Sequence, residues 1–231
     1  MRAYLHNGFH EMKTNLSAFL TFEASIHYYH HKAARDNLHS LLPCSRLIWV
    51  LRNPLSRAVS EYMHQAVKSK SYPSFQSLIS AELAAIRTCR KTVDIQMKEG
   101  FDNNLFKCIS NFKLKKFMIS TAFYSYFING WLEKFPRQQH YFLDYELFKL
   151  NPQEAVAQIS TFLSLAHPPT LNYTWKYNKA NTRDGKAVKL RSSIRISSRL
   201  HKEISREISP FVAKIYEVVH QNFDWDLNSL S

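Results

Sequence analysis

The pattern of apolar and polar positions predicts strands that alternate with helices. Residues 47–51, Leu-Ile-Trp-Val-Leu, form a short and partly β-branched apolar run, which is typical of a strand buried on both faces of a parallel sheet. A further strand is predicted near residues 18–22. Helices are predicted over residues 5–15, 32–42, 75–88 and 118–135. This alternation favours an α/β fold with a parallel sheet flanked by helices.

Two more helical segments are predicted toward the C-terminus. Asn151, Pro152 and Glu154 supply an N-cap, a first-turn proline and an early acidic residue. The apolar residues that follow share one helical face: Ala155, Val156, Ile159, Phe162 and Leu163. A second amphipathic stripe contains Leu200, Ile204 and Ile208. Ser209 and Pro210 are then expected to cap a separate last helix that carries Val212, Ile215, Tyr216 and Val219.

The junction after residues 47–51 combines features of an anion site. Arg52 lies where the strand ends, Asn53 is a good N-cap and Pro54 suits the first helical position. We therefore expect free amide groups and the positive end of the helix dipole to face a bound phosphate. Ser60 lies two turns further on and can donate a hydroxyl. The alternative is an ordinary strand-to-helix junction with an arginine at the surface.

Composition and charge narrow the classes of function. The chain has 231 residues, of which 45% are hydrophobic, enough for one globular domain. It contains no apolar run of membrane-spanning length and no signal-like stretch at its start, so the chain alone reads as soluble. Its formal charge of +13 indicates an anionic partner, either nucleic acid or a sulfated or uronic-acid glycan. No nucleic-acid-binding motif accompanies the charge, which can also reflect basic residues spread over solvated faces.

Cysteine and histidine positions give no metal signature. Cys44, just before the predicted strand, is expected to be a free and buried thiol. No CxxC spacing occurs among the three cysteines, and the histidines do not follow a zinc pattern. His27, His30 and His31 cluster around two tyrosines, for which we expect an exposed loop rather than a metal site.

The segment Leu51 to Tyr62 reads Leu-Arg-Asn-Pro-x-x-Arg-Ala-x-Ser-x-Tyr. It resembles the 3′-phosphate motif of sulfotransferases that use 3′-phosphoadenylyl sulfate (PAPS). The resemblance implies that Arg52 and Ser60 hold the 3′-phosphate of this donor or of its product PAP. Arg57 and Tyr62 also match the pattern, and we interpret them as packing and surface residues.

The resemblance extends from about residue 20 to the C-terminus and is greatest to Golgi carbohydrate sulfotransferases that act on N-acetylgalactosamine 4-sulfate. The supporting segments are Phe22 to Ser25, Leu41 to Pro43, Ala122 to Tyr124, Trp131 to Pro136, a strand over residues 139–143, the Asp144-Tyr145-Glu146 turn and Phe162 to Leu165. It implies the P-loop NTPase-like sulfotransferase fold, sulfuryl transfer to a hydroxyl of an anionic glycan, no metal and no nucleic-acid partner. Full-length relatives are type II membrane proteins of the Golgi lumen.

The resemblance also suggests roles for two segments outside the motif. The basic loop Lys179 to Lys189 is similar in position and composition to the loop that closes over the nucleotide, which implicates Arg183, Gly185 and Lys186 in donor binding. Cys89 and Cys108 flank a polar stretch where the resembling enzymes carry a cysteine pair. A disulfide there would add about 3 kcal/mol in an oxidising compartment, whereas cytosol would keep two thiols.

Two family features are not recognised in the sequence: the Gly-rich loop for the 5′-phosphosulfate and the Lys-Glu motif that supplies a base. We therefore expect residues 1–231 to be a partial, N-terminally truncated sulfotransferase domain. Glu11, Glu23 and His27 are possible substitutes for the base, but no spacing selects one, so no catalytic residue is assigned. Three hypotheses remain: a carbohydrate sulfotransferase, a non-catalytic relative that binds PAP or a polyanion, and a basic nucleic-acid binder.

Overall fold

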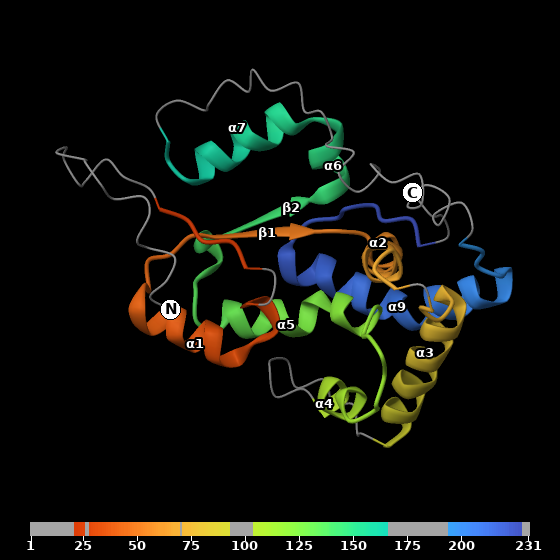
Figure 1. Ribbon diagram of the computed structural model, residues 1–231. Helices are drawn as coiled ribbons and strands as arrows, with labels where there is room; N and C mark the ends of the chain where they lie inside the picture. Colours follow the sequence, from red (N-terminus) through yellow and green to blue (C-terminus); the bar gives the residue numbers. More distant parts are fainter. Residues whose placement is uncertain (1–20, 26–27, 70, 93–103, 166–193, 228–231) are drawn as a thin grey trace.

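The computed structural model describes residues 21–25, 28–69, 71–92, 104–165 and 194–227. Within them a parallel sheet of two strands lies between two groups of helices (Figure 1). Strand β1 (Leu47–Leu51) pairs with β2 (His140–Asp144), in register from Leu47 opposite His140 to Leu51 opposite Asp144. This arrangement confirms the predicted α/β class.

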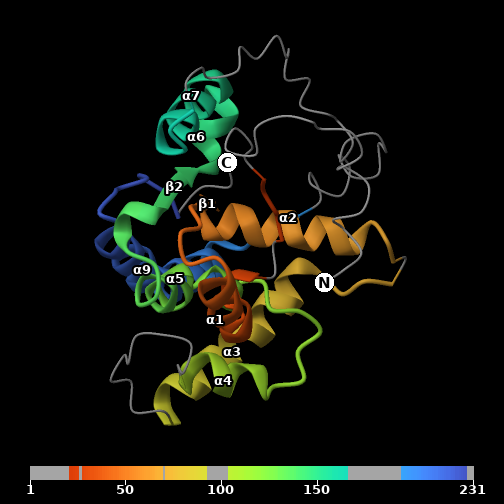
Figure 2. The same ribbon diagram turned by 90° about the vertical axis from the view of Figure 1, so that its left-hand side faces the viewer.

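Helices cover the sheet on both sides, as Figures 1 and 2 agree. On one side lie α6 (Tyr145–Leu150) and α7 (Pro152–Phe162), and on the other α5 (Tyr124–Leu132) and α9 (Ser198–Val219). The remaining helices are α1 (Lys32–Leu41), α2 (Pro54–Ala66), α3 (Phe75–Thr92) and α4 (Asn104–Ser110), with 3-10 turns η2 (Tyr28–His30), η3 (Ser120–Ala122) and η4 (Arg137–Gln139).

The two faces of the sheet are packed unequally. Trp49 points toward α5, where its ring meets that of Trp131 edge to face at 5.6 Å. On the opposite face Ile48 and Val50 remain 40% and 56% exposed, because α6 and α7 pack against β2. The expectation that residues 47–51 are buried on both faces is therefore wrong: the strand is covered on one face only within the described part of the chain.

Most predicted elements are present with shifted ends. Helix α1, predicted over residues 32–42, ends at Leu41, α3 continues to Thr92 instead of residue 88, and β2 begins one residue later than expected. Residues 21–25 have no regular secondary structure and Phe22 is 92% exposed, so this end of the predicted strand 18–22 is wrong. Residues 1–20, with the predicted helix 5–15, lie outside the described residues.

The predicted helix over residues 118–135 is two shorter elements. Turn η3 ends at Ala122, and Phe123 leaves helical geometry with φ −76° and ψ 60° before α5 begins. The Phe123 ring stacks on Phe211 of α9 at 3.7 Å, and the carboxylate of Glu82 fixes the amides at the start of the segment. Tertiary contacts therefore interrupt a segment whose apolar pattern is continuous.

Helix α9 shows the opposite error, because the predicted break at Ser209 and Pro210 does not occur. Pro210 lies inside one helix of 22 residues. A proline in a helix interior costs about 3 kcal/mol. The buried stripe runs on both sides of it and offsets this cost: Leu200, Ile204, Ile208, Phe211, Val212, Ile215 and Val219.

Two of the three cysteines are joined. Cys89 of α3 and Cys108 of α4 form a disulfide with a Cα separation of 5.8 Å, so the pair links the ends of the two helices. Cys44 is free and exposed, which corrects the expectation of a buried thiol. It lies in the turn before β1, beside Leu41 and Leu42, whose side chains are also exposed.

The histidine cluster is only partly an exposed loop. Tyr28, Tyr29 and His30 form the 3-10 turn η2, and the Tyr29 ring packs edge to face on Phe127 of α5 at 5.1 Å. His31 is exposed, and His27 lies outside the described residues. Among the described residues no three metal-ligating side chains gather, and no helix is long and apolar enough to cross a membrane.

Candidate functional site

The candidate site lies where β1 and β2 end side by side. Leu51 pairs with Asp144 at the last register position, so Arg52 follows one strand and Tyr145 and Glu146 follow the other. In open parallel sheets, ligands bind at the carboxyl ends of the strands. The pairing therefore brings together two chain segments that lie about 90 residues apart in the sequence.

The start of α2 is capped as predicted, but its amides are not free. The Asn53 side-chain oxygen accepts from the amides of Leu55 and Ser56 at 2.9 and 3.2 Å, and the Asn53 carbonyl accepts from Arg57 at 2.9 Å. Pro54 has no amide hydrogen. The expectation that free N–H groups face a phosphate is therefore wrong, since the cap itself uses them. Positive charge at this junction comes from the Arg52 side chain.

Arg52 is held at three points. Its Nε donates to Glu146 Oε1 at 3.0 Å, its guanidinium lies over the Tyr145 ring at 4.7 Å, and its carbonyl accepts from the Tyr124 hydroxyl at 3.0 Å. The side chain is 20% exposed. Its two Nη groups have no hydrogen-bond partner among the described residues, so they can contact a bound anion.

Glu146 links Arg52 to a second cation. Lys149 Nζ lies 2.8 Å from Glu146 Oε2, so the two carboxylate oxygens hold one cation each. Burial raises the pKa of Glu146, but hydrogen bonds from Lys149 and Arg52 outweigh it and leave the pKa below its usual value. Glu146 is therefore ionised at neutral pH, and the three side chains together are cationic.

Asp144, the last residue of β2, is buried. Its side chain accepts from the Glu146 amide at 2.9 Å and caps α6. Burial is the main influence on this carboxyl and raises its pKa, which the hydrogen bond from the amide offsets only in part. Its role in the structure is to fix the turn that carries Tyr145 and Glu146.

Ser60 lies on α2 and its side chain faces solvent. It is about 9 Å along the helix axis from Pro54 by the rise of an α-helix. Within the described part of the chain its hydroxyl has no hydrogen-bond partner. The structure thus places Ser60 on the helix that Arg52 precedes, without a contact between the two side chains.

Arg57 and Tyr62 pack as the sequence suggested. Arg57 donates to the Met118 carbonyl at 2.9 Å, and Tyr62 is buried with its ring 5.4 Å from that of Phe75. Both residues attach α2 to neighbouring segments rather than to the edge of the sheet. Among the matched positions of the motif, Arg57 and Tyr62 are therefore packing residues, whereas Arg52 and Ser60 keep donors without a partner in the described part of the chain.

Several predicted residues lie outside the described residues or away from the site. Arg183, Gly185 and Lys186 are outside the described part, as are Glu11 and His27. Glu23 is exposed in a segment without regular structure and makes no hydrogen bond within the described residues. No catalytic base is assigned from the described residues.

Sequence reasoning missed Tyr124, Tyr145, Glu146 and Lys149 as site residues. A signal existed for the last three, because carboxyl ends of neighbouring parallel strands meet at one edge of a sheet. The residues after β2 therefore had to lie near those after β1. For Tyr124 no local signal exists, because its hydroxyl reaches the Arg52 carbonyl through the packing of α5.

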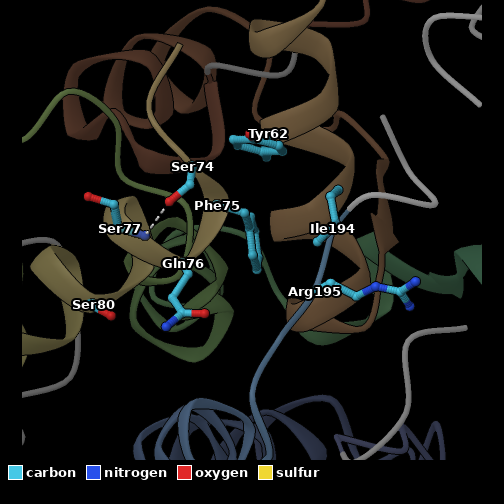
Figure 3. A pocket seen from close by; sticks show the side chains of 8 residues that line it. All are labelled: Tyr62, Ser74, Phe75, Gln76, Ser77, Ser80, Ile194 and Arg195. Atoms are coloured by element: carbon cyan, nitrogen blue, oxygen red, sulfur yellow. Dashed lines mark hydrogen bonds between the residues drawn. The ribbon is translucent and has the colours of Figure 1, made fainter. Parts of the chain in front are cut away.

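A hollow elsewhere among the described residues is a weaker candidate. It measures about 540 Å3 and lies between α2, the start of α3 and the segment before α9 (Figure 3). Serines and apolar side chains line it, and Arg195, its cationic residue, extends away from the serines in Figure 3. None of the residues around Arg52 contributes to it.

Comparison with known proteins gives a family match over most of the chain. The family model described as "Sulfotransferase domain" matches residues 30–214. Heparan sulfate glucosamine 3-O-sulfotransferase 6 of Mus musculus is 24% identical over 228 residues, which cover 93% of this chain and 59% of the relative. Carbohydrate sulfotransferase 15 of Homo sapiens is 27% identical over 134 residues, 57% of this chain and 22% of the relative.

A solved structure shares the fold. The sulfotransferase from Alicyclobacillus acidocaldarius superposes with a TM-score of 0.56 at 19% identity, covering 86% of this chain and 64% of that one. The chain spans less than two thirds of the length of both the mouse relative and this bacterial protein. The matched range 30–214 includes Arg52, Ser60, Glu146 and Lys149.

Proposed function

Because the chain belongs to the family of proteins with a sulfotransferase domain, we propose that it binds PAPS and transfers the sulfuryl group to a carbohydrate hydroxyl. One observation carries the proposal. Arg52 lies at the shared carboxyl edge of β1 and β2, within the family's motif, and both of its Nη groups lack partners among the described residues. A cation with unused donors at this edge is suited to a phosphate.

In this proposal the donor is recognised through its 3′-phosphate. Arg52 and Ser60 bind the 3′-phosphate, and Arg183, Gly185 and Lys186 contribute from the basic loop. The acceptor oxygen forms a bond to sulfur while the bond between sulfur and the phosphate oxygen breaks, which releases PAP. The acceptor hydroxyl gives its proton to a base, for which we name no residue.

We propose an anionic glycan, a glycosaminoglycan, as the acceptor. The formal charge of +13 supports this, since a basic surface attracts a sulfated or uronic-acid chain. The mouse and human relatives named above are a heparan sulfate and a carbohydrate sulfotransferase, which supports the same class. In this proposal the chain needs no metal ion, binds no nucleic acid and makes no contact with the membrane.

We also propose that the protein acts in the Golgi lumen. The disulfide between Cys89 and Cys108 supports this location, because disulfides persist in oxidising compartments and are rare in cytosol. The resemblance to carbohydrate sulfotransferases of the Golgi points to the same compartment.

Calorimetric titration with PAP tests the proposed donor site. We expect the wild type to bind PAP and Arg52→Ala to bind it at least about tenfold more weakly, because a charge-assisted bond to phosphate contributes roughly 1.5–3 kcal/mol. Arg199→Ala is the matched control: it removes one arginine that is 91% exposed on α9. A folded wild type that does not bind PAP contradicts the proposal.

A transfer assay with radiolabelled PAPS and heparan or chondroitin sulfate tests the chemistry separately. Labelled glycan supports the full proposal. PAP binding without transfer identifies a non-catalytic nucleotide-binding relative. Binding to DNA with a steep salt dependence and indifference to PAP identifies a nucleic-acid binder instead.

A further inference from the structure

Resting on the proposed function, we propose that Glu146 is a positioning residue for Arg52, which it orients through Nε so that both Nη groups are available to the 3′-phosphate. The contact that carries this inference is the bond from Arg52 Nε to Glu146 Oε1 at 3.0 Å. It joins the residues after β1 to those after β2. Nothing else in the described contacts fixes the direction of the guanidinium plane except the Tyr145 ring.

The choice of nitrogen decides how Arg52 can meet a phosphate. A guanidinium forms paired bonds to an oxyanion either through its two Nη groups or through Nε and one Nη. Glu146 occupies Nε, and the Tyr145 ring, 4.7 Å from the guanidinium carbon, covers one face. Only the pair of Nη groups then remains for a bidentate contact.

Holding Arg52 in place lowers the conformational entropy that its side chain would lose on binding the phosphate. A free arginine side chain samples many rotamers, and this freedom is lost when the side chain becomes fixed. In this structure groups of the protein itself hold the Arg52 side chain: Glu146 at Nε and the ring of Tyr145 along one face of the guanidinium. A prepositioned group therefore binds more tightly than a mobile one.

The competing role is that of a counter-ion that repels the phosphate and must be displaced. Two observations argue against it. Lys149 Nζ lies 2.8 Å from the second Glu146 oxygen, so that one carboxylate faces two cations and the cluster stays positive. The bond to Nε also leaves both Nη groups of Arg52 without a partner in the described part of the chain, so a ligand need not break it.

The test compares two ligands that differ in one phosphate, PAP and adenosine 5′-phosphate, by calorimetry. We expect Glu146→Ala to weaken PAP binding about tenfold and to change adenosine 5′-phosphate binding less than about twofold, because only the first ligand uses Arg52. Glu146→Gln keeps an oxygen that can accept from Nε, so we expect it to restore much of the affinity for PAP. A general structural role would weaken both ligands equally.

Glu217→Gln is the matched control. Like Glu146 and Lys149, Glu217 and Lys214 form a pair three residues apart on a helix, but on α9. We expect this variant to bind both ligands as the wild type does. PAP binding by Glu146→Ala that equals or exceeds that of the wild type overturns the inference alone. A folded wild type that does not bind PAP overturns the proposed function and the inference with it.

Discussion

Glu82 and Glu146 are both held carboxylates, but their surroundings differ. Glu82 is fully buried and accepts from the amides of Met118, Ile119 and Ser120 and from the Ser120 hydroxyl, at 2.7 to 2.9 Å. Its partners are mostly backbone groups, fixed in place by the chain. Glu146 is 25% exposed and bonds two long side chains, those of Arg52 and Lys149, and Arg52 retains donors without a partner among the described residues.

The difference separates a carboxylate whose hydrogen bonds are internal to the fold from one at the candidate site. Around Glu82 the three amides and the Ser120 hydroxyl all donate to the same carboxylate, so within the described residues this cluster has no spare donor for a ligand. Around Glu146 the Arg52 side chain is 20% exposed, and its Nη groups are unpartnered within the described residues. Such leftover donors at a strand edge mark the position where an anion can bind.

Removing the Glu82 carboxylate should have the largest effect on stability. We expect Glu82→Ala to lower the free energy of unfolding by about 4 kcal/mol, because it leaves three buried amides without their acceptor. Chemical denaturation with urea measures the change. Glu146→Ala is the comparison variant and should cost less than about 1 kcal/mol, since its pairs are partly solvated. Equal losses for the two variants would contradict the distinction.

His140, like Glu82, is a buried polar side chain whose hydrogen bonds are internal to the fold, because both of its ring nitrogens have a partner. Its Nδ1 accepts from Trp49 Nε1 at 2.9 Å, and its Nε2 donates to the Phe135 carbonyl at 3.0 Å. A ring that accepts at Nδ1 is neutral. Burial lowers the pKa of His140 to about 4, more than the bond to the Phe135 carbonyl raises it.

The pH dependence follows from this lowered pKa. Between pH 6.5 and 4 the unfolded chain binds a proton at His140 that the folded chain does not, so stability falls as the pH falls. We expect a loss of about 3 kcal/mol in the free energy of unfolding across this range. His140→Gln should abolish this loss and so flatten the plot of the free energy of unfolding against pH. An unchanged slope in the variant would show that His140 is not the group responsible.

Substitution of Ser60 should have the smallest effect of the three, and it tests whether this residue contributes to PAP binding. We expect Ser60→Ala to leave stability unchanged and to weaken PAP binding roughly threefold to tenfold, as the loss of one hydrogen bond implies. Ser80→Ala removes a similarly exposed serine from α3, beside the hollow of Figure 3, and should not affect PAP. Equal effects of the two variants would remove Ser60 from the site.

Much of the fold was predictable from local pattern. The β1 strand and the capped start of α2 follow from an apolar run, Asn53 and Pro54, and the buried stripe of α9 from its period. The errors arose where distant groups intervene. Phe211 packs on Phe123 and breaks one predicted helix, and buried contacts on both sides of Pro210 continue another.

The candidate site was likewise predictable only in part. The motif identified Arg52 and Ser60 as expected ligands of the 3′-phosphate, and the family match is now established for residues 30–214. The roles of these two residues stay predictions, as do those of Arg183, Gly185 and Lys186. The amides at the start of α2 were expected to take part but do not, because Asn53 satisfies them.

The family, the strand before the motif and the arginine that follows this strand can all be recognised in the amino-acid sequence, because they depend on residues close together in the chain. The surroundings of that arginine depend instead on tertiary contacts. The register of β1 on β2 brings Tyr145 and Glu146 to Arg52, and the packing of α5 brings Tyr124. A local pattern fixes backbone conformation, whereas the partner of a side chain depends on which distant segments pack beside it.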